Sequence, residues 1–217
     1  MAHSIFTGSF AALESKWMDV VAGIQRNDPL QGIHVLVGSN ILASYLKRTY
    51  ARSGRALANV RFLNFLDLAG RLAGAGEIAE KKRPLPHLGH SIILEDILAA
   101  HTPDIFSPLS GYPGFRDALL DTFRDLRDAA VTPREFFDFV QANSGLDYRR
   151  PQLTALADLY RRFRETVGQY HDVDDDFRAA IRNAPEARHV LGSRQLLVYG
   201  IYDATGQQSQ LLAALKN

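Results

Sequence analysis

Two short stretches carry residue types that could take part in nucleotide chemistry, and the first is Gly8–Ser15, "GSFAALES". A phosphate-binding loop has the frame G-x-x-x-x-G-K-[ST], in which glycines admit backbone N–H groups to the phosphates, a lysine neutralises them and a hydroxyl binds magnesium. Gly8 and Ser15 match this frame, but Leu13 replaces the second glycine and Glu14 replaces the lysine. The anion at Glu14 would repel a triphosphate. The stretch therefore predicts either a degenerate nucleotide site or a plain strand–turn–helix.

The second stretch is Leu196–Leu212, "LLVYGIYDATGQQSQLL", in which an apolar strand ends at Tyr199-Gly200 and a polar turn leads into a helix. In a nucleotide-driven motor the residues after such a strand are acidic, because they hold a magnesium ion. Tyr199 and Gly200 offer no carboxylate. The pattern fits a motor strand without its chemistry, or an unrelated strand.

Other charged or metal-type clusters have simpler interpretations. The acidic run His171–Phe177 has neither EF-hand nor nuclease spacing, so we predict helix capping and first-turn acids at Asp174, Asp175 and Asp176. The seven histidines form no H-x-x-x-H pair and predict no zinc site. We therefore expect no metal and no cofactor.

Basic residues gather in three places and are typical of solvated surfaces. They are the run Glu80–Pro84, the set Arg48, Arg52 and Arg55 beside one helix, and the set Arg161, Arg162 and Arg164 on another.

The composition is that of an ordinary globular protein. The 217 residues are 46% hydrophobic and 23% charged, with a net charge of +1 and no cysteine. The small net charge gives no global attraction to DNA or membrane, so any nucleic-acid surface must be local. The start has no leader pattern and no apolar run reaches the length of a membrane span. These features, with the missing disulfides, predict a cytoplasmic protein without membrane contact.

The elements that must position these residues alternate in type over the first third of the chain. The predicted strands are 4–10, 32–39 and 59–65, and the predicted helices are 12–25, 41–50 and 66–74. Ser39 or Asn40 can cap the second helix, and Ser53-Gly54 ends it. Alternation with short connections predicts parallel strands joined by right-handed crossovers.

From about residue 90 to 188 the spacing is helical throughout, after an exposed linker over 74–89 that is rich in Gly, Pro and charge. Thr132, with Pro133 and Glu135 after it, predicts a capped helix start. A strand over 194–200 and a helix over 207–217 then return to the sheet. We therefore predict a three-layer α/β domain with a parallel sheet over 1–80 and 193–217, and an inserted all-helical subdomain over 81–192. The chain stops without a closing strand, which suggests a fragment of a longer protein.

Four stretches, 34–54, 60–74, 114–136 and 196–215, carry a family resemblance that extends over nearly the whole chain. Three α/β units, a helical insertion and a return to the sheet resemble the first RecA-like, P-loop-NTPase-like domain of UvrD-type helicases. The details are similar to the N-terminal region of AddB-type helicase–nuclease subunits, or of a RecB-family nuclease protein of that kind. In such proteins this region resembles a helicase that no longer hydrolyses ATP, and an iron–sulfur nuclease domain often follows much later.

The UvrD-type pattern Val-Asp-Glu-x-Gln-Asp-x-x-x-x-Gln allows a comparison position by position. Val198, Asp203 and Gln208 match it, whereas Tyr199 stands at the magnesium-binding Asp and Gly200 at the Glu that activates water. The resemblance therefore implies a retained frame with a lost catalytic pair, and no catalytic residue in this chain. Asp203 can instead cap the turn, and Gln208 can sit in the first turn of the last helix.

In the helicase family the loops after the second and third strands contact the DNA backbone. These loops are Gly38-Ser39-Asn40 and Asn64-Phe65 here. Ser39, Asn40 and Asn64 could donate to phosphate at two helix N-termini, and Phe65 could stack on a base. The alternative is that Ser39 and Asn40 cap a helix and Phe65 packs in the core.

The resemblance implies a catalytically inert helicase-like region of a DNA helicase–nuclease subunit that acts in double-strand-break repair and recombination. We expect it to contact DNA, most simply a single strand, and a motor subunit. Whether the full-length protein is a nuclease depends on any sequence beyond Asn217. The alternative is a purely structural interaction module with a degenerate P-loop fold and no DNA contact.

Overall fold

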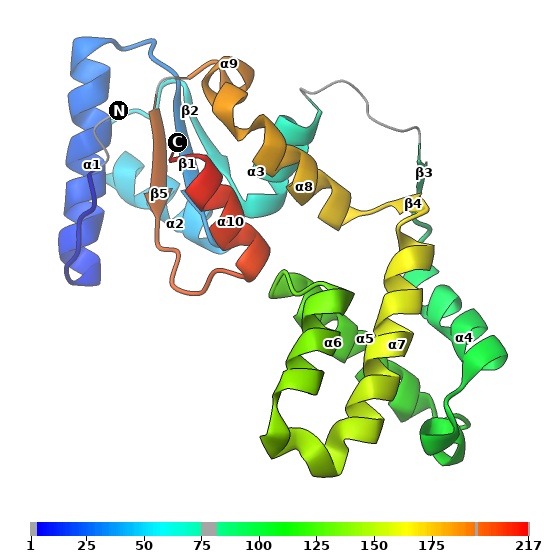
Figure 1. Cartoon of the computed structure of the whole chain (residues 1–217). Helices are drawn as coiled ribbons and strands as arrows, with labels where there is room; N and C mark the ends of the chain where they lie inside the picture. The colour runs from blue at the N-terminus through cyan, green and yellow to red at the C-terminus, as the bar shows by residue number, and fades with distance from the viewer. Residues whose placement is uncertain (1–3, 75–81, 194, 217) are drawn as a thin grey trace. The chain divides into compact units, whose positions relative to one another are not determined.

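The computed structural model describes residues 4–74, 82–193 and 195–216 (Figure 1). The chain forms two units, which are considered separately. Unit 1 comprises residues 1–77, 176–204 and 208–217, and unit 2 comprises residues 78–175 and 205–207. The predicted insertion over 81–192 extends beyond unit 2 at its carboxyl end, because residues after Asp175 pack with the sheet of unit 1.

Unit 1 is built on a parallel sheet of three strands in the order β2-β1-β5. The strands are β1 (Ile33–Val37), β2 (Val60–Leu63) and β5 (Gln195–Tyr199). All five residues of β1 are buried, as expected for the central strand of a parallel sheet that is covered on both faces. Leu36 of β1 pairs with Leu63 of β2 on one side and with Val198 of β5 on the other. This register brings the carboxyl ends of the three strands to one edge of the sheet.

Helices cover both faces of this sheet. They are α1 (Phe10–Asn27), α2 (Asn40–Arg52), α3 (Phe65–Ala73), α8 (Val173–Asn183), η3 (Ala184–Glu186), α9 (Ala187–Leu191) and α10 (Gly206–Ala214). Side chains of a strand alternate between faces, so Ile33, Val35 and Val37 pack with α1 and α2, while Leu36 packs with α3, α8 and α10. The predicted layered α/β arrangement is therefore present in unit 1, and its connection from β1 through α2 to β2 is parallel as predicted.

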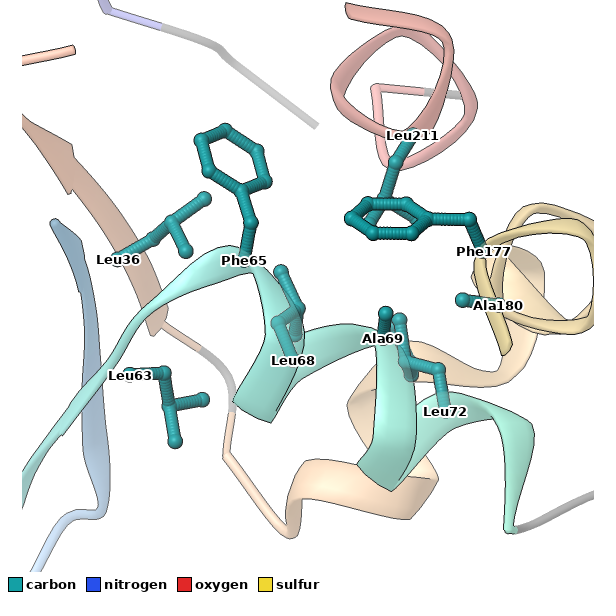
Figure 2. Close-up of a cluster of buried hydrophobic side chains, with 10 residues drawn as sticks. Leu36, Leu63, Phe65, Leu68, Ala69, Leu72, Phe177, Ala180 and Leu211 are labelled. Atoms are coloured by element: carbon teal, nitrogen blue, oxygen red, sulfur yellow. The ribbon is translucent and has the colours of Figure 1, made fainter. Parts of the chain in front are cut away.

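The second of these two cores is shown in Figure 2. Leu68 and Leu72 of α3 meet Phe177 and Ala180 of α8, and Leu211 of α10 lies beside Phe177. A bond from the Asn183 amide to the Leu72 carbonyl, 2.8 Å long, adds a polar tie between α3 and α8. Residues more than a hundred positions apart in the sequence therefore share one apolar core.

Unit 2 is helical apart from one two-residue ladder. Its elements are β3 (Arg83–Pro84), α4 (Gly89–His101), η1 (Asp104–Leu109), α5 (Pro113–Asp128), α6 (Pro133–Ala142), η2 (Ser144–Arg149), α7 (Arg150–Val167) and β4 (Tyr170–His171). Phe123 of α5 packs against the rings of Tyr160 and Phe163 of α7 at the centre of its core. The predicted N-cap at Thr132 is confirmed, and it forms a capping box, since the side chains of Thr132 and Glu135 each accept from the other's backbone N–H.

Two sequence-based predictions of strands are wrong. The ladder of β3 with β4 places a strand inside the stretch that was predicted to have none, and two residues are too few to give a periodic signal. The predicted strand over 4–10 is also not formed: residues 4–9 have no strand, Ile5 is 81% exposed, and Phe10 already belongs to α1. The Ser9 side chain accepts a bond from the Ala12 N–H and so starts the helix there.

Candidate functional site

The stretch Gly8–Ser15 does not form a phosphate-binding loop. Only Gly8 and Ser9 precede α1, so Leu13, Glu14 and Ser15 already lie within the helix. The Leu13 N–H donates to the Ser9 carbonyl oxygen at 3.0 Å. A phosphate loop needs backbone N–H groups that are free to point at the ligand, and that of Leu13 is committed to the helix. The structure therefore matches neither of the two alternatives in full. Gly8–Ser15 forms no phosphate-binding loop, and residues 4–9 form no strand before the helix.

Tyr199, at the position of the magnesium-binding Asp, turns inward from the end of β5. Its side chain is buried, with 8% exposure, and its ring lies 6.3 Å from the ring of Trp17 of α1. Burial raises the pKa of the Tyr199 phenol, and the negative charge of Glu14 raises it further. The residue is therefore a neutral aromatic core group rather than an anionic metal ligand.

Gly200, at the position of the catalytic Glu, has a backbone that only glycine adopts freely. Its φ is +65°, and a Cβ at this position would lie 2.7 Å from Cδ2 of Leu42 on α2. Side chains meet both steric and conformational strain there. A glutamate at this position would have to adopt the left-handed backbone and displace the end of the Leu42 side chain.

Glu14 joins Trp17, Tyr45 and Tyr199 in a group that we term the Tyr199 cluster. A hydrogen bond with the Glu14 carboxylate raises the pKa of the exposed Tyr45 hydroxyl. Among the described residues, no hydrogen-bond partner is found for Glu14 Oε2, Trp17 Nε1 or the Tyr199 hydroxyl, all of which are buried. The cluster thus contains one carboxylate and three aromatic rings, and it offers no cation to neutralise a triphosphate.

Asp203 and Gln208, the two matched polar positions, lie on either side of the start of α10. Gln208 sits in the first turn of this helix, as predicted. Asp203 is exposed in the connection between β5 and α10. Its predicted capping role stays a prediction.

The predicted DNA-binding residues lie together at the carboxyl edge of the sheet, directly after β1 and β2. The Ser39 hydroxyl caps α2 by accepting from the Leu42 N–H at 3.2 Å, and Asn64 caps α3 in a capping box with Asp67. Ser39 and Asn40 are exposed and Asn64 is half-buried. Two helix N-termini therefore point to neighbouring positions on one edge, an arrangement that favours anions.

Phe65 differs from the other three, because it is 6% exposed and packs in the core that Figure 2 shows. This position agrees with the alternative prediction that Phe65 packs in the core. A buried ring of this kind has no free face for a nucleobase.

Asp174, Asp175 and Asp176 lie in the first turn of α8, as predicted, but the cap is made by another residue. Asp172, not Asp174, makes the cap: its Oδ1 accepts from the Asp175 N–H at 3.2 Å, and Asp175 Oδ2 accepts from the Asp172 N–H at the same distance. Asp174 is instead buried within unit 2 and accepts from Arg127, Arg164 and Gln207. The burial raises the pKa of the Asp174 carboxyl, but the two guanidinium groups outweigh it, so the pKa is lowered.

Residues of the other charged clusters form ion pairs within the chain. Lys82 pairs with Asp175 at 3.4 Å, Arg161 pairs with Asp158 and Glu165, and Glu80 and Lys81 lie outside the described residues. Within the described ranges, no three His, Cys, Asp or Glu side chains come together as a metal site.

A hollow of about 430 Å³ lies elsewhere on unit 1, between the later turns of α1 and α2. It is lined by Asp19, Ala22, Gln25, Arg26, Tyr50, Arg55 and Ala56. The Tyr50 hydroxyl donates to Gln25 Oε1 at 3.1 Å on its wall. The carboxyl-terminal turns of both helices border this hollow, and their dipoles disfavour an anionic ligand there.

Exposed apolar residues at the start of α2 were not predicted. Ile41 and Tyr45 share the helical spacing of Leu42, Leu46 and Tyr50. The structure buries Leu46 and Tyr50 and leaves Ile41 82% and Tyr45 38% exposed. Apolar residues cover more than half a turn of this helix, so spacing alone could not tell which of them face the sheet.

Charge is divided unevenly between the two units. Unit 1 has 13 Lys and Arg against 8 Asp and Glu, a net charge of +5. Unit 2 has 12 against 16, a net charge of −4, and the two values add to the +1 of the chain. The predicted DNA-contacting residues are therefore all in the basic unit.

Comparison with known proteins identifies a family and a relative. Residues 47–217 match the family described as "ADDB, N-terminal". The B subunit of an ATP-dependent helicase/deoxyribonuclease of Moorella thermoacetica is 30% identical over 166 residues, an alignment that covers 73% of this chain and 14% of that protein. The chain thus spans about a seventh of that relative's length. In the described part of the chain, no helix is both long and apolar enough to cross a membrane.

Proposed function

The chain belongs to the AddB N-terminal family, and from this premise we propose that it is a catalytically inert, RecA-like region of a helicase–nuclease subunit. In this proposal it holds a DNA strand and contacts a motor subunit during the processing of DNA double-strand breaks. The proposal rests on the family and on the likeness to a relative that is named as a helicase and deoxyribonuclease subunit.

The observation that carries the inert state is the Tyr199 cluster together with Gly200. Tyr199 is packed on Trp17, Gly200 needs a left-handed backbone, and Glu14 adds an anion. Nucleotide hydrolysis needs a metal ligand, a water-activating base and a phosphate clamp. The side chains at these positions are a neutral phenol, a hydrogen atom and a carboxylate, so the proposed inactivity follows from their chemistry.

The test of the inert state is nucleotide binding by the 217-residue chain. We expect no binding of a fluorescent ATP analogue with Mg²⁺ at millimolar concentration, and no phosphate release above buffer. Saturable binding that Glu14→Gln strengthens would overturn the proposal, because it would place a phosphate beside Glu14.

The observations that support DNA contact are the two helix N-termini after β1 and β2 and the charge of +5 on their unit. Ser39 and Asn64 use their side-chain oxygens as caps, which leaves the Ser39 hydroxyl hydrogen and the Asn64 amide hydrogens as donors. Asn40 is exposed beside them. In the proposal these three residues contact phosphate, and Phe65 anchors the start of α3 from the core.

A single-charge variant tests this contact without removing a cap. Asn40→Asp adds an anion to the first turn of α2, which the helix dipole stabilises but a phosphate does not tolerate. We expect weaker binding of a fluorescent single-stranded oligonucleotide, by roughly 5- to 10-fold at low salt. Gln152→Glu, the matched control, adds the same charge to the first turn of α7 in unit 2. Equal binding by Asn40→Asp and the wild type would contradict the proposed phosphate contact.

The alternative of an interaction module without DNA contact is favoured by one observation, the net charge of −4 on unit 2. DNA is repelled by such a unit, whereas a basic protein surface is attracted. The salt dependence of binding separates the two functions: affinity for single-stranded DNA that falls steeply as salt rises supports phosphate contact. A folded chain that binds no DNA at low salt supports the interaction module.

A further inference from the structure

The exposed face of α2 carries an unusual sequence of side chains. Ile41, Tyr45, Arg48 and Arg52 follow one another at spacings of four, three and four residues, which places them in one row along the helix. All four are exposed. The row begins directly after Ser39 and Asn40 and extends for about 16 Å at about 1.5 Å per residue.

The apolar end of this row is widened by a second aromatic ring. Phe10, the first residue of α1, is 47% exposed, and its ring centroid lies 5.7 Å from that of Tyr45 at an angle of 52°. Two rings from two helices thus form one solvent-facing aromatic surface, with Ile41 one turn away. We name Phe10, Ile41, Tyr45, Arg48 and Arg52 the α2 stripe.

Among the described residues, no nearby carboxylate neutralises the arginines at the basic end of the stripe. Within the described ranges, neither Arg48 nor Arg52 has a carboxylate at ion-pairing distance. Arg48 Nε donates to the Ser44 carbonyl at 3.3 Å, which holds this exposed side chain along α2. The positive charge of Arg52 reaches the Tyr45 hydroxyl, where it opposes the rise in pKa caused by Glu14. The aromatic and basic parts are therefore electrostatic neighbours.

From this arrangement we propose that the α2 stripe binds single-stranded nucleic acid, with bases stacked on Tyr45 and Phe10 and phosphates paired with Arg48 and Arg52. The inference rests on the proposed function and extends its DNA contact from the strand ends onto a helix face. Unpaired bases expose the π-faces that aromatic side chains stack on, while a duplex hides them. The free guanidinium groups in a unit of net charge +5 select a polyanion over an acidic or neutral protein surface.

Stacking and phosphate contact can be tested separately by the choice of oligonucleotide. The 217-residue chain is titrated with a fluorescent oligothymidylate and with an oligomer of the same length made of abasic units, which has the phosphates but no bases. Tyr45→Ala is expected to weaken oligothymidylate binding by roughly 5- to 100-fold, the range for loss of one stacked base, and to leave abasic binding unchanged. Tyr45→Phe retains the ring and is expected to bind like the wild type. Tyr148→Ala, which removes an exposed tyrosine of unit 2, is the matched control.

The arginines are tested by the slope of affinity against salt. Arg48→Gln and Arg52→Gln are each expected to reduce the slope by about 0.7 on both oligomers, the value for one phosphate contact on a single strand. Arg134→Gln, at an exposed arginine of unit 2, is expected to leave the slope unchanged. Thermal unfolding of each variant establishes that the fold is intact.

The possible outcomes separate this inference from the proposed function. If Asn40→Asp weakens binding while Tyr45→Ala and both arginine variants bind like the wild type, the α2 stripe is not the site, and the proposed DNA contact at the strand ends stands. If the folded chain binds neither oligomer, both fail. If Tyr45→Ala leaves DNA binding unchanged but removes binding to a motor subunit, the stripe is a protein interface and the inference is wrong.

Discussion

Gly200 illustrates how a single residue can be fixed by its surroundings rather than by a reaction. Its φ of +65° and the 2.7 Å approach of an added methyl group to Leu42 would each penalise any side chain.

Gly200→Ala is therefore expected to lower the free energy of unfolding of unit 1 by about 2–4 kcal/mol. Urea unfolding followed by the fluorescence of Trp17, the single tryptophan, measures this. Gly23→Ala is the control, since Gly23 lies inside α1 with nothing within 4 Å of the added Cβ; it is expected to stabilise by about 0.5–1 kcal/mol. A neutral Gly200→Ala would show that the connection after β5 relaxes freely.

His34 of β1 is the second residue whose environment makes a measurable prediction. It is 3% exposed, and among the described residues neither ring nitrogen has a hydrogen-bond partner. Burial lowers its pKa, and the charges of Arg61 and Arg71 lower it further. The unfolded chain takes up a proton near the ordinary value of about 6.5, whereas the folded chain resists it.

The free energy of unfolding is therefore expected to be highest above about pH 6.5. It is expected to fall as the pH drops from that value toward the lowered pKa of His34. The difference between the melting temperatures at about pH 7.5 and about pH 5.5, on either side of that value, measures the loss. His34→Leu, which replaces two unpaired nitrogens by an apolar group of similar size, is expected to reduce that difference. His90 remains in the variant, so its own lowered pKa cancels in the comparison. Identical pH profiles for the two proteins would exclude His34 as the cause.

At the scale of elements, the junction between α5 and α6 holds a residue in an unfavourable conformation. Ala130 has φ +60°, and the Val131 N–H donates to the Leu126 carbonyl at 2.8 Å across it. This is a Schellman motif, whose left-handed position is normally a glycine. Alanine lacks the freedom of glycine there.

Ala130→Gly is expected to stabilise unit 2 by about 1 kcal/mol, because the left-handed backbone no longer carries a Cβ. The neighbouring control, Ala129→Gly, lies at φ −73° and is expected to be neutral or destabilising. Thermal unfolding of the two variants gives the comparison. A loss of stability in Ala130→Gly would mean that its methyl group makes contacts worth more than the strain.

The elements also show what sequence reasoning could reach. The strands at Ile33–Val37, Val60–Leu63 and Gln195–Tyr199 were predicted because short apolar runs between helical segments are typical of buried parallel strands. The strand over 4–10 is not formed: no strand of the described sheet pairs with these residues, and Phe10 already belongs to α1. The local sequence pattern indicates which element a segment can form, but a strand forms only where a neighbouring strand pairs with it.

For the candidate site, too, the residue types could be read from the sequence but their arrangement in space could not be predicted from it. The residue types at positions 14, 199 and 200 could be read directly from the sequence, where Glu14, Tyr199 and Gly200 stand at the positions compared with the motor pattern. Their arrangement could not, because it depends on the inward turn of Tyr199 onto Trp17 of α1 and on the closeness of Leu42 of α2 to the place where a Cβ on Gly200 would lie.

The capping residue of α8 was missed for a similar reason. Asp174 lies inside the first turn of α8 and pairs with Arg127 and Arg164. Neither arginine is near Asp174 in the sequence, so only the packing of α5 and α7 reveals the pairing.

At the scale of the whole chain, the division of charge predicts where nucleic acid is found. Unit 1 at +5 and unit 2 at −4 give the chain a strong internal asymmetry behind its net charge of +1. Overall charge is therefore a poor guide to its affinity for polyanions, and the local balance decides.

Photo-crosslinking of single-stranded DNA followed by mass spectrometry is expected to label peptides of unit 1, chiefly those of α1 and α2, and to leave unit 2 unlabelled. The number of crosslinks is expected to fall as salt rises. Labels concentrated on α5 or α7 would contradict the expected role of the basic unit.

The left-handed backbone of Gly200 and the closeness of Leu42 to it have a consequence for how the protein can evolve. Gaining a metal-binding pair would need an acid at 199, an acid at 200 and a cation at 14. Each change alone meets a penalty: a buried carboxylate beside Glu14, a strained backbone, or the loss of the Tyr45 partner. No single step toward the motor pattern is favourable before the others are made. The changes toward a metal-binding pair are therefore expected to be tolerated only in combination.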